Sequence, residues 1–324
     1  MKAIVYRGSG GVEAIAIENR PDPVPGPGQI LVRVRAAGLN RADLIQRKGA
    51  YPAPPGWPAD VPGLEYAGEV EALGPGVGRW RAGDRVMGLV GGGAQAELLA
   101  VNEAEAMPVL ASADDAAAAA IPEAFLTAYD ALALRAGVVP GERVLIHAVG
   151  SGVGTAAVQL VSWLGGVSIG TSRTPGKLER AKALGLAEAI DTGAGGFGQA
   201  LGAPVDVILD FFGGGALAEN LAALAPRGRL VLLGTLQGGT ASAVDLGRVL
   251  RGRLSIIGSV MRSRGPEERE PLVEEFSRRA LPAFAGTTPA LRPVVGATFP
   301  MAEVAEAHRA MEANEVFGKI VLTV

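Results

Sequence analysis

The sequence predicts an α/β protein in which a β-rich domain is interrupted by a doubly wound domain. Residues 1–110 consist of short apolar runs separated by turn clusters, a pattern that favours a compact barrel or sandwich. From Arg143 to Gly258, apolar strands alternate with helical segments, as in a parallel sheet covered on both faces. Beyond Pro266 the chain continues in helices and strands, and we expect this part to return to the first domain.

The first domain is expected to contain short strands and one helix. The helix is Arg41–Arg47, and the strands are Lys2–Tyr6, Ala14–Glu18, Ile30–Ala37, Glu65–Leu73, Asp84–Leu89 and Gln95–Val101. Further along, Ser112 and Asp115 have the spacing of an N-terminal capping box, and the alanines after them favour a helix. A second helix is expected over Glu123–Ala136.

The second domain follows from the alternation of strand and helix. The expected strands are Val144–Val149, Val167–Thr171, Val205–Asp210, Leu230–Leu233 and Leu254–Gly258, and the expected helices are Gly154–Leu164, Pro175–Leu184, Ala216–Leu224 and Asp245–Leu250. The returning part should contain a helix from Pro266 to Phe284, a strand Leu291–Phe299, a helix Ala302–Asn314 and a strand Gly318–Val324. We therefore expect domains at 1–123, 124–265 and 266–324.

Composition excludes several classes of function. The 30 Lys and Arg residues nearly balance the 33 Asp and Glu residues, so we expect no basic surface for nucleic acid or for an anionic membrane. The chain has no cysteine and only two histidines, His147 and His308, which excludes cysteine zinc sites and a histidine-rich metal site. We expect both histidines to be structural. Because we find no signal core and no good membrane span, we expect a cytoplasmic protein.

The strongest local motif is the glycine-rich turn after the strand that begins near Arg143. The stretch Ala148-Val-Gly-Ser-Gly-Val-Gly154 leads from this strand into a helix, and Gly152-x-Gly154-x-x-Ala157 fits the dinucleotide fingerprint in that context. Glycine permits a close approach of the backbone to a pyrophosphate, and the helix N-terminus offers it free N–H groups. The alternative is a glycine-rich turn that only packs. No Walker lysine follows, which disfavours ATP and GTP.

The end of the next strand indicates which dinucleotide binds. NAD sites usually carry an acidic residue about 20 residues after the glycines, whereas this strand ends in Gly170-Thr-Ser-Arg-Thr174. The hydroxyl of Ser172 and the cations of Arg173 and Lys177 suit the 2′-phosphate of NADP(H), which an acid would repel. The alternative is that Arg173 and Lys177 are solvated charges at a helix start. We predict NADPH as the cofactor.

Taken together, the motifs resemble the zinc-free quinone oxidoreductases of the medium-chain dehydrogenase/reductase superfamily over essentially the whole chain. The landmarks are Ala37-Gly-Leu-Asn40-Arg-Ala-Asp43, Gly49-Ala-Tyr51-Pro52, Pro62-Gly-Leu-Glu65-Tyr-Ala-Gly68, Gly83-Asp-Arg-Val86, Ala148–Gly154 and Gly318-Lys-Ile-Val321. Within that family the sequence looks most similar to the tumour-suppressor-inducible branch. The stretches that carry this likeness are Gly91-Gly-Gly-Ala-Gln-Ala96, Ile121-Pro-Glu-Ala-Phe-Leu-Thr-Ala128 and Ser259-Val-Met-Arg-Ser-Arg264.

The resemblance implies a GroES-like barrel domain that carries the catalytic residues, a Rossmann domain, and an active site in the cleft between them. Zinc-dependent relatives have a cysteine before the stretch that holds Asn40, a Gly-His-Glu at the third landmark and a cysteine-rich structural loop. This chain has Gly63-Leu64-Glu65 there and no cysteine at all, so we expect no metal. Glu65 is then expected to be structural.

The resemblance also implies roles for individual residues. Asn40 and Tyr51 should lie at the nicotinamide and substrate pocket, where each offers a hydrogen-bond donor. The alternatives are that Asn40 caps the helix after it and that Tyr51 packs on neighbouring prolines. The implied cofactor-binding residues are Thr127, Gly150, Ser151, Gly152, Val153, Gly154, Ser172, Arg173, Lys177, Gly234, Thr235, Met261, Arg262 and Lys319. The branch often has a large aromatic residue over the adenine, which here is missing unless Phe197 replaces it.

Without a metal, the expected reaction is hydride transfer from NADPH to a quinone. The first alternative keeps the fold and cofactor and reduces activated alkenes such as enones or enoyl thioesters. The second is a dinucleotide-binding protein with a structural or RNA-binding role, which the balanced charge disfavours. By resemblance we also expect a homodimer joined through edge strands near Leu254–Val260.

Overall fold

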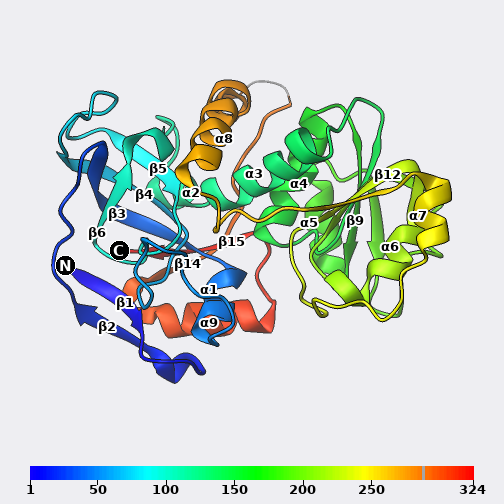
Figure 1. Cartoon of the computed structure of the whole chain (residues 1–324), viewed down its shortest axis with the longest axis horizontal. Helices are drawn as coiled ribbons and strands as arrows, with labels where there is room; N and C mark the ends of the chain where they lie inside the picture. Colours follow the sequence, from blue (N-terminus) through cyan, green and yellow to red (C-terminus); the bar gives the residue numbers. More distant parts are fainter. Residues whose placement is uncertain (287–288) are drawn as a thin grey trace. The chain divides into compact units, whose positions relative to one another are not determined.

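The structure is a computed structural model of the whole chain and describes residues 1–286 and 289–324. The chain forms two compact units (Figure 1). Unit 1 comprises Met1–Leu126, Met261–Ala285 and Pro293–Val324, and unit 2 comprises Thr127–Val260 and Gly286–Arg292. The chain therefore passes between the units near residues 126 and 260, and a short segment near residue 290 belongs with unit 2.

Unit 1 is built mainly from strands. They are β1 (Lys2–Tyr6), β2 (Ile15–Asn19), β3 (Gln29–Leu39), β4 (Glu65–Leu73), β5 (Arg85–Leu89), β6 (Leu98–Asn102), β7 (Ala106–Pro108), β14 (Val295–Pro300) and β15 (Lys319–Thr323). Its helices are α1 (Arg41–Arg47), α2 (Asp115–Ala119), α8 (Pro266–Arg279) and α9 (Val304–Ala313), and α3 (Pro122–Tyr129) begins in this unit. These elements form the β-rich domain that the sequence predicts.

One mixed sheet of unit 1 combines strands from the N-terminal and C-terminal parts of the chain. Its strand order is β14-β15-β3-β4-β5-β7, and β6 pairs with β3 on a separate path. The last strand, β15, runs antiparallel to β3, and Figure 1 shows these red and blue segments side by side. This pairing places the start of β15 against the end of β3, because Ile320 lies opposite Leu39.

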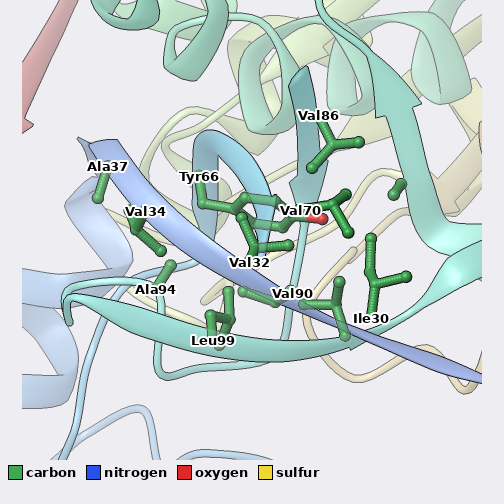
Figure 2. Packing of buried hydrophobic residues seen from close by; sticks show 12 residues of the cluster. Ile30, Val32, Val34, Ala37, Tyr66, Val70, Val86, Val90, Ala94 and Leu99 are labelled. Atoms are coloured by element: carbon green, nitrogen blue, oxygen red, sulfur yellow. The ribbon is translucent and has the colours of Figure 1, made fainter. Parts of the chain in front are cut away.

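The alternation of apolar residues in β3 and β4 produces the core of this sheet. Val32 and Val34 from β3 and Tyr66 and Val70 from β4 are buried in one cluster, as Figure 2 shows. Successive side chains of a strand point to opposite faces, so residues two apart share the buried face. Trp57 packs against this cluster from the loop that precedes β4.

Unit 2 is an open, fully parallel sheet with helices packed against it. Its strands are β8 (Arg143–Ile146), β9 (Val167–Ser172), β10 (Glu188–Asp191), β11 (Val205–Asp210), β12 (Leu224–Leu232) and β13 (Ser255–Gly258), and its helices include α4 (Gly152–Trp163), α5 (Pro175–Lys182), α6 (Leu217–Ala223) and α7 (Leu246–Gly252). The strand order is β10-β9-β8-β11-β12-β13. Counted from β8, this is the order 3-2-1-4-5-6 of the Rossmann fold.

Several local expectations were wrong. The first alanine-rich helix is capped by Asp114, whose carboxylate accepts the N–H of Ala117, and not by Ser112. Residues Glu123–Ala136 are not one α-helix, because α3 gives way to a π-helix over Asp130–Arg135. The first strand of unit 2 ends at Ile146, three residues early, because Ala148 has a left-handed backbone with φ of 48°. The short strand β10 was not predicted.

Within the described part of the chain, one helical stretch, Asp115–Arg135, is long and apolar enough to cross a membrane by length and composition alone. However, 78% of its most apolar window is buried inside the protein. Core helices of globular proteins pass the same test when they are hydrophobic all round. This stretch is therefore accounted for by packing within the fold.

Candidate functional site

The glycine-rich turn lies where the sheet of unit 2 reverses its order. It follows β8, and β8 has β9 on one side and β11 on the other. Chain connections run outward in opposite directions from this point, which leaves a crevice at the carboxyl ends of the strands. Dinucleotides bind at such switch points in open α/β sheets. The turn predicted from the sequence therefore occupies the position that a dinucleotide requires.

The local geometry of this turn is suited to binding an anion. Ser151 is the N-cap of α4, and its hydroxyl accepts the N–H of Gly154 at 3.0 Å. A Cβ on Gly154 would lie 2.5 Å from the carbonyl oxygen of Ala148, so only glycine lets the helix start this close to the strand end. The remaining N–H groups of the first helical turn are left for a ligand, as at other phosphate-binding helix ends.

The residues predicted to bind the 2′-phosphate surround the end of β9. The Ser172 hydroxyl accepts the N–H of Thr174 at 3.1 Å, which forms the turn into α5. Thr174 itself makes no side-chain cap. Arg173 is exposed and Lys177 is half-buried. A Cβ built on Gly150 would lie 2.7 Å from Cδ of Lys177, so the lysine stem runs directly beside the glycine turn.

Two further loops of unit 2 end at the same edge of the sheet. Gly234 and Thr235 follow β12, and a Cβ on Gly213 would lie 3.0 Å from Cα of Thr235, so these two loops touch. Asp210 at the end of β11 fixes the second loop, because its carboxylate accepts the N–H groups of Phe212 at 2.7 Å and Gly213 at 3.1 Å. Gly234 and Thr235 therefore lie beside the loop that follows β11, and their contact with a cofactor stays a prediction.

His147 lies beneath the turn as a buried structural residue. It is 1% exposed, and its ring nitrogens face Thr171 Oγ1 at 2.9 Å and Asn220 Oδ1 at 2.7 Å. Burial lowers the pKa of His147, which keeps the ring neutral. Phe197 packs against it with ring centroids 4.9 Å apart and is itself 3% exposed. Phe197 is therefore a core residue and does not replace the aromatic residue over the adenine.

Thr127, the first residue of unit 2, carries a buried hydroxyl that has no hydrogen-bond partner among the described residues. It is 8% exposed. A mid-helix threonine usually bonds back to a carbonyl of its own helix, but this one does not. Buried polar groups are nearly always paired, so an orphaned hydroxyl suggests a missing ligand group. Together with the open turn, this hydroxyl is compatible with the binding of a nicotinamide dinucleotide.

In unit 1, Asn40 belongs to a buried cluster with Glu65 and Lys319. The amide of Asn40 donates to Glu65 Oε1 at 3.0 Å, and its oxygen accepts from Lys319 Nζ at 2.6 Å. The Lys319 ammonium also pairs with Glu65 and donates to the carbonyl of Leu39 at 3.2 Å. The second oxygen of Glu65 accepts the N–H of Glu123 at 2.7 Å.

This cluster changes the roles expected from the resemblance. Lys319 is 4% exposed and uses all three of its N–H donors within unit 1, so none is left for the cofactor phosphates that we expected it to contact. Asn40 stands at the N-cap position of α1, yet its side-chain amide is occupied by Glu65 and Lys319. Glu65 is the structural residue that the sequence indicates.

Asp43 anchors the start of α1 beside this cluster. Its carboxylate accepts the N–H of Asn40 at 2.7 Å and the N–H of Gly63 at 3.2 Å, and the side chain is fully buried. Burial raises the pKa of Asp43 to about 6, while those two backbone N–H groups oppose the rise. Asp43 thus fixes the backbone on both sides of the cluster.

Tyr51, the other predicted site residue of unit 1, is partly exposed, and its hydroxyl has no hydrogen-bond partner among the described residues. Burial raises the pKa of its phenol, Glu123 adds to the rise and Arg262 opposes it, so the phenol stays protonated at neutral pH. Its ring lies 4.9 Å from the Arg262 guanidinium. Met261 and Arg262 are both 4% exposed and belong to unit 1.

The residues that the structure describes show no arrangement typical of a zinc site. Among the described residues no group of three or more His, Cys, Asp and Glu side chains could hold a metal. The chain contains no cysteine, and its two histidines lie in different units. The carboxylate of Glu65 already has Lys319, Asn40 and the Glu123 N–H as partners. The described side chains therefore provide no set of ligands for a catalytic metal.

The sequence analysis did not single out Gln46 in unit 1 or Asp210 in unit 2. Gln46 on α1 accepts a hydrogen bond from Arg262 at 2.7 Å. Nothing local distinguishes it from an ordinary helix residue. Asp210, in contrast, stands at the carboxyl end of a predicted strand and precedes a glycine triplet, a pattern that could have identified it.

Two family models match the chain. A model described as an alcohol dehydrogenase GroES-like domain matches residues 26–111, and one described as a zinc-binding dehydrogenase matches residues 152–278. They fall on unit 1 and largely on unit 2, respectively. The chain thus combines a GroES-like domain with a Rossmann domain, the fold class that the sequence predicts. The description of the second model includes zinc, whereas no group of three or more metal-binding side chains occurs among the described residues.

Curated relatives span nearly the whole chain. The quinone oxidoreductase of Pseudomonas aeruginosa is 32% identical over 330 residues, covering 99% of each chain. The 2-haloacrylate reductase of a Burkholderia species is 32% identical over 335 residues, covering 99% of this chain and 98% of its own. The synaptic vesicle membrane protein VAT-1 homolog of Mus musculus is 31% identical over 343 residues, covering 99% and 83%.

Solved structures agree with these relatives. The quinone oxidoreductase of Pseudomonas syringae pv. tomato DC3000 has a TM-score of 0.89 at 29% identity, covering 100% of this chain and 99% of its own. The CurK enoyl reductase has a TM-score of 0.87 at 26% identity, with 99% and 98% covered. A mycobacterial protein complexed with NADPH has a TM-score of 0.87 at 28% identity, with 100% of both covered. The chain belongs to the medium-chain dehydrogenase/reductase superfamily of oxidoreductases.

Proposed function

We propose that the protein is an NADPH-dependent quinone reductase that works without a metal. The observation that carries this proposal is a dinucleotide turn at the switch point of a Rossmann sheet, in a chain that has no cysteine and whose described residues contain no cluster of metal-binding side chains. Metal-assisted reaction of a carbonyl or alcohol substrate would need a bound ion to act as a Lewis acid. An electron-poor π system such as a quinone accepts a hydride without one. The relative from Pseudomonas aeruginosa, named a quinone oxidoreductase, supports this choice of substrate class.

In this proposal the cofactor lies along the carboxyl edge of the unit 2 sheet. The turn Gly150, Ser151, Gly152, Val153 and Gly154 receives the pyrophosphate, and Ser172, Arg173 and Lys177 receive the 2′-phosphate. Gly234 and Thr235 flank the cofactor, and Thr127 donates to or accepts from the nicotinamide carboxamide. Met261 stays a proposed contact that rests on the resemblance alone. When bound, the nicotinamide supplies the hydride, and the protein supplies orientation and electrostatics.

On the substrate side, Tyr51 is the proposed donor. As a hydride adds to the quinone ring, negative charge builds on a carbonyl oxygen, and a hydrogen bond to that oxygen strengthens. The Tyr51 phenol is protonated and its hydroxyl is available. Asn40 is proposed to form part of the pocket wall, where Glu65 and Lys319 fix the orientation of its amide. Solvent can supply the proton that completes the reduction.

Reduction of an activated alkene is the second candidate. It requires the same cofactor and the same donor, because charge also builds on the carbonyl oxygen of an enone or enoyl thioester. The relatives named 2-haloacrylate reductase and CurK enoyl reductase favour this candidate. The two functions therefore differ in the pocket that holds the substrate and not in the chemistry of hydride transfer.

A paired substrate assay separates these candidates. Purified protein is mixed with NADPH and either a benzoquinone or an enone, and the loss of NADPH absorbance is followed for each. Quinone turnover with a kcat/KM at least tenfold above that for the enone supports quinone reduction. The reverse ratio assigns alkene reduction, and no turnover with either class rejects both. Repeating the assay with NADH tests the cofactor.

We also propose that the protein is a cytoplasmic homodimer, joined through β13. This strand is last in the sheet order, and Ile256 on it and Val260 after it are 42% and 48% exposed. An open strand edge with apolar side chains is prone to pair with another chain. Light scattering should therefore give twice the mass of one chain. Ile256→Lys should give the monomer mass, whereas Val139→Lys, at an exposed site elsewhere in unit 2, should not.

A further inference from the structure

Arg262 is a buried cation whose three nitrogens all have partners in unit 1. Nε donates to the carbonyl of Gly91 at 2.8 Å, Nη1 donates to the carbonyl of Tyr51 at 2.9 Å, and Nη2 donates to Gln46 Oε1 at 2.7 Å. The residue is 4% exposed. The guanidinium is a rigid planar fork, so three bonds of this kind fix the relative positions of three separate segments.

One of these segments is the loop that carries Tyr51, and the other two contact it. Gln46, besides accepting from Arg262, donates to the carbonyl of Ala59 at 3.2 Å. The loop between α1 and β4 is thus tied near its start, at the Tyr51 carbonyl, and near its end, at the Ala59 carbonyl. A Cβ on Gly91 would lie 2.5 Å from the ring of Trp57, so the third segment also packs tightly against this loop.

The side chain of Tyr51 is held as well as its backbone. The Arg262 guanidinium lies 4.9 Å from the centroid of the phenol ring, within the range of a cation–π interaction. Four prolines, Pro52, Pro54, Pro55 and Pro58, follow Tyr51 in the loop and cannot donate backbone hydrogen bonds. The loop therefore depends on accepting hydrogen bonds from outside itself, and Arg262 supplies one of them.

We propose that Arg262 is a positioning residue that orders the 49–60 loop and thereby aims the Tyr51 hydroxyl at the substrate oxygen. This inference rests on the proposed function for its kinetic consequence, but the ordering of the loop is independent of it. It replaces the expectation that Arg262 binds the cofactor. The partners of Arg262 lie at positions 46, 51 and 91, far from it in sequence and all in unit 1.

The first test measures the loop directly in the full-length protein without substrate. Arg262→Lys keeps a positive charge but loses the planar fork. Hydrogen exchange of the peptide covering residues 49–60, followed by mass spectrometry, should become at least tenfold faster in this variant. Arg229→Lys is the matched control, because the Arg229 guanidinium in unit 2 also makes three bonds, to the carbonyl of Ala136 and to Glu142, and none of these partners is in the 49–60 loop. It should leave exchange in the 49–60 peptide within twofold of wild type.

The second test asks whether Arg262 acts through the Tyr51 hydroxyl. With saturating NADPH and one quinone, Arg262→Lys should lower kcat about tenfold and leave the Kd of NADPH within twofold. In a Tyr51→Phe background the same substitution should lower kcat less than twofold, because the hydroxyl that it positions is already absent. Gln46→Leu removes one of the three partners and should give a smaller loss of the same kind, which covers the case that Arg262→Lys folds poorly.

The outcomes are distinct. Unchanged exchange in the 49–60 peptide overturns the proposal, as does a full tenfold loss of kcat in the Tyr51→Phe background. If Arg262→Lys raises the Kd of NADPH tenfold and leaves exchange in the 49–60 peptide unchanged, Arg262 binds the cofactor, as the resemblance implies. If the wild-type protein reduces neither quinones nor enones, the proposed function is wrong, and the exchange measurement still decides whether Arg262 orders the loop.

Discussion

Removal of the Lys177 side chain should weaken NADPH and leave NADH nearly unchanged. The lysine stem passes beside Gly150, where a Cβ would approach its Cδ to 2.7 Å, and Lys177 lies in the first turn of α5, which follows the end of β9 after two residues. Ser172 and Arg173 lie at that strand end, and the sequence between β9 and α5 holds no acid. Lys177→Ala therefore removes one cation from the position that we assign to the 2′-phosphate.

The magnitude follows from the surroundings of Lys177. A charge-assisted hydrogen bond to phosphate contributes about 1.5–3 kcal/mol. Lys177 is half-buried, so solvent screens part of its charge and the lower end of this range applies. At about 1.4 kcal/mol per decade, we expect the Kd of NADPH to rise roughly tenfold. NADH lacks the 2′-phosphate, and its Kd should change less than twofold.

Calorimetric titration of both cofactors into wild type and variant measures this difference. Lys182→Ala is the control, because Lys182 is on the same helix, is 51% exposed and pairs with Glu179 at 2.7 Å. It changes the net charge equally but lies more than a helical turn further along α5. An equal loss for NADPH and NADH would refute the assignment of Lys177. So would a tenfold loss of NADPH affinity in Lys182→Ala.

Three further predictions follow from the site and the core. If Tyr51 donates to the substrate oxygen, Tyr51→Phe should lower kcat roughly ten- to hundredfold at saturating NADPH, because the lost donor stabilises the transition state and each tenfold loss of rate corresponds to about 1.4 kcal/mol. Near wild-type turnover in Tyr51→Phe, together with a raised KM in Tyr51→Ala, would show that Tyr51 only forms a wall of the pocket. Dialysis against a chelator should leave activity unchanged, and one zinc per chain by elemental analysis would contradict the argument from the missing cysteines. Burial lowers the pKa of His308 to about 3 in the folded protein, so between pH 7 and pH 5 only the unfolded chain gains this proton, and His308 by itself lowers the unfolding free energy by about 2 kcal/mol over this range. In His308→Gln this part of the pH dependence should vanish in urea titrations, and an unchanged slope would count against it.

Local patterns predicted the elements that carry the site. The helix Arg41–Arg47 and the strand Glu65–Leu73 have the bounds that the sequence indicates, because their turn residues and apolar runs are unambiguous. The glycine-rich turn was placed at the first strand of a parallel sheet, where it is found. These predictions held because glycine, proline and apolar spacing act over a few residues. The strand β10 was missed, since it is only four residues long.

Tertiary structure corrected what the resemblance assigned to long cationic side chains. Lys319 meets Asn40 across 279 residues of sequence, and Arg262 meets Gln46 across 216. No sequence pattern near Lys319 or Arg262 indicates these partners. A buried cation takes whichever oxygen atoms the fold brings within reach, because desolvation makes an unpaired buried charge costly.

The sequence by itself determined the two-domain α/β class, the position of the dinucleotide turn, the absence of cysteine ligands and the cationic end of β9. Each of these depends on residue type and short-range spacing. The tertiary structure decided that Glu65 and Lys319 hold Asn40, that Arg262 ties the Tyr51 loop, and that Phe197 lies in the core. Those outcomes depend on which distant strands pair, and β3 with β15 is the pairing that brings Asn40 and Lys319 together.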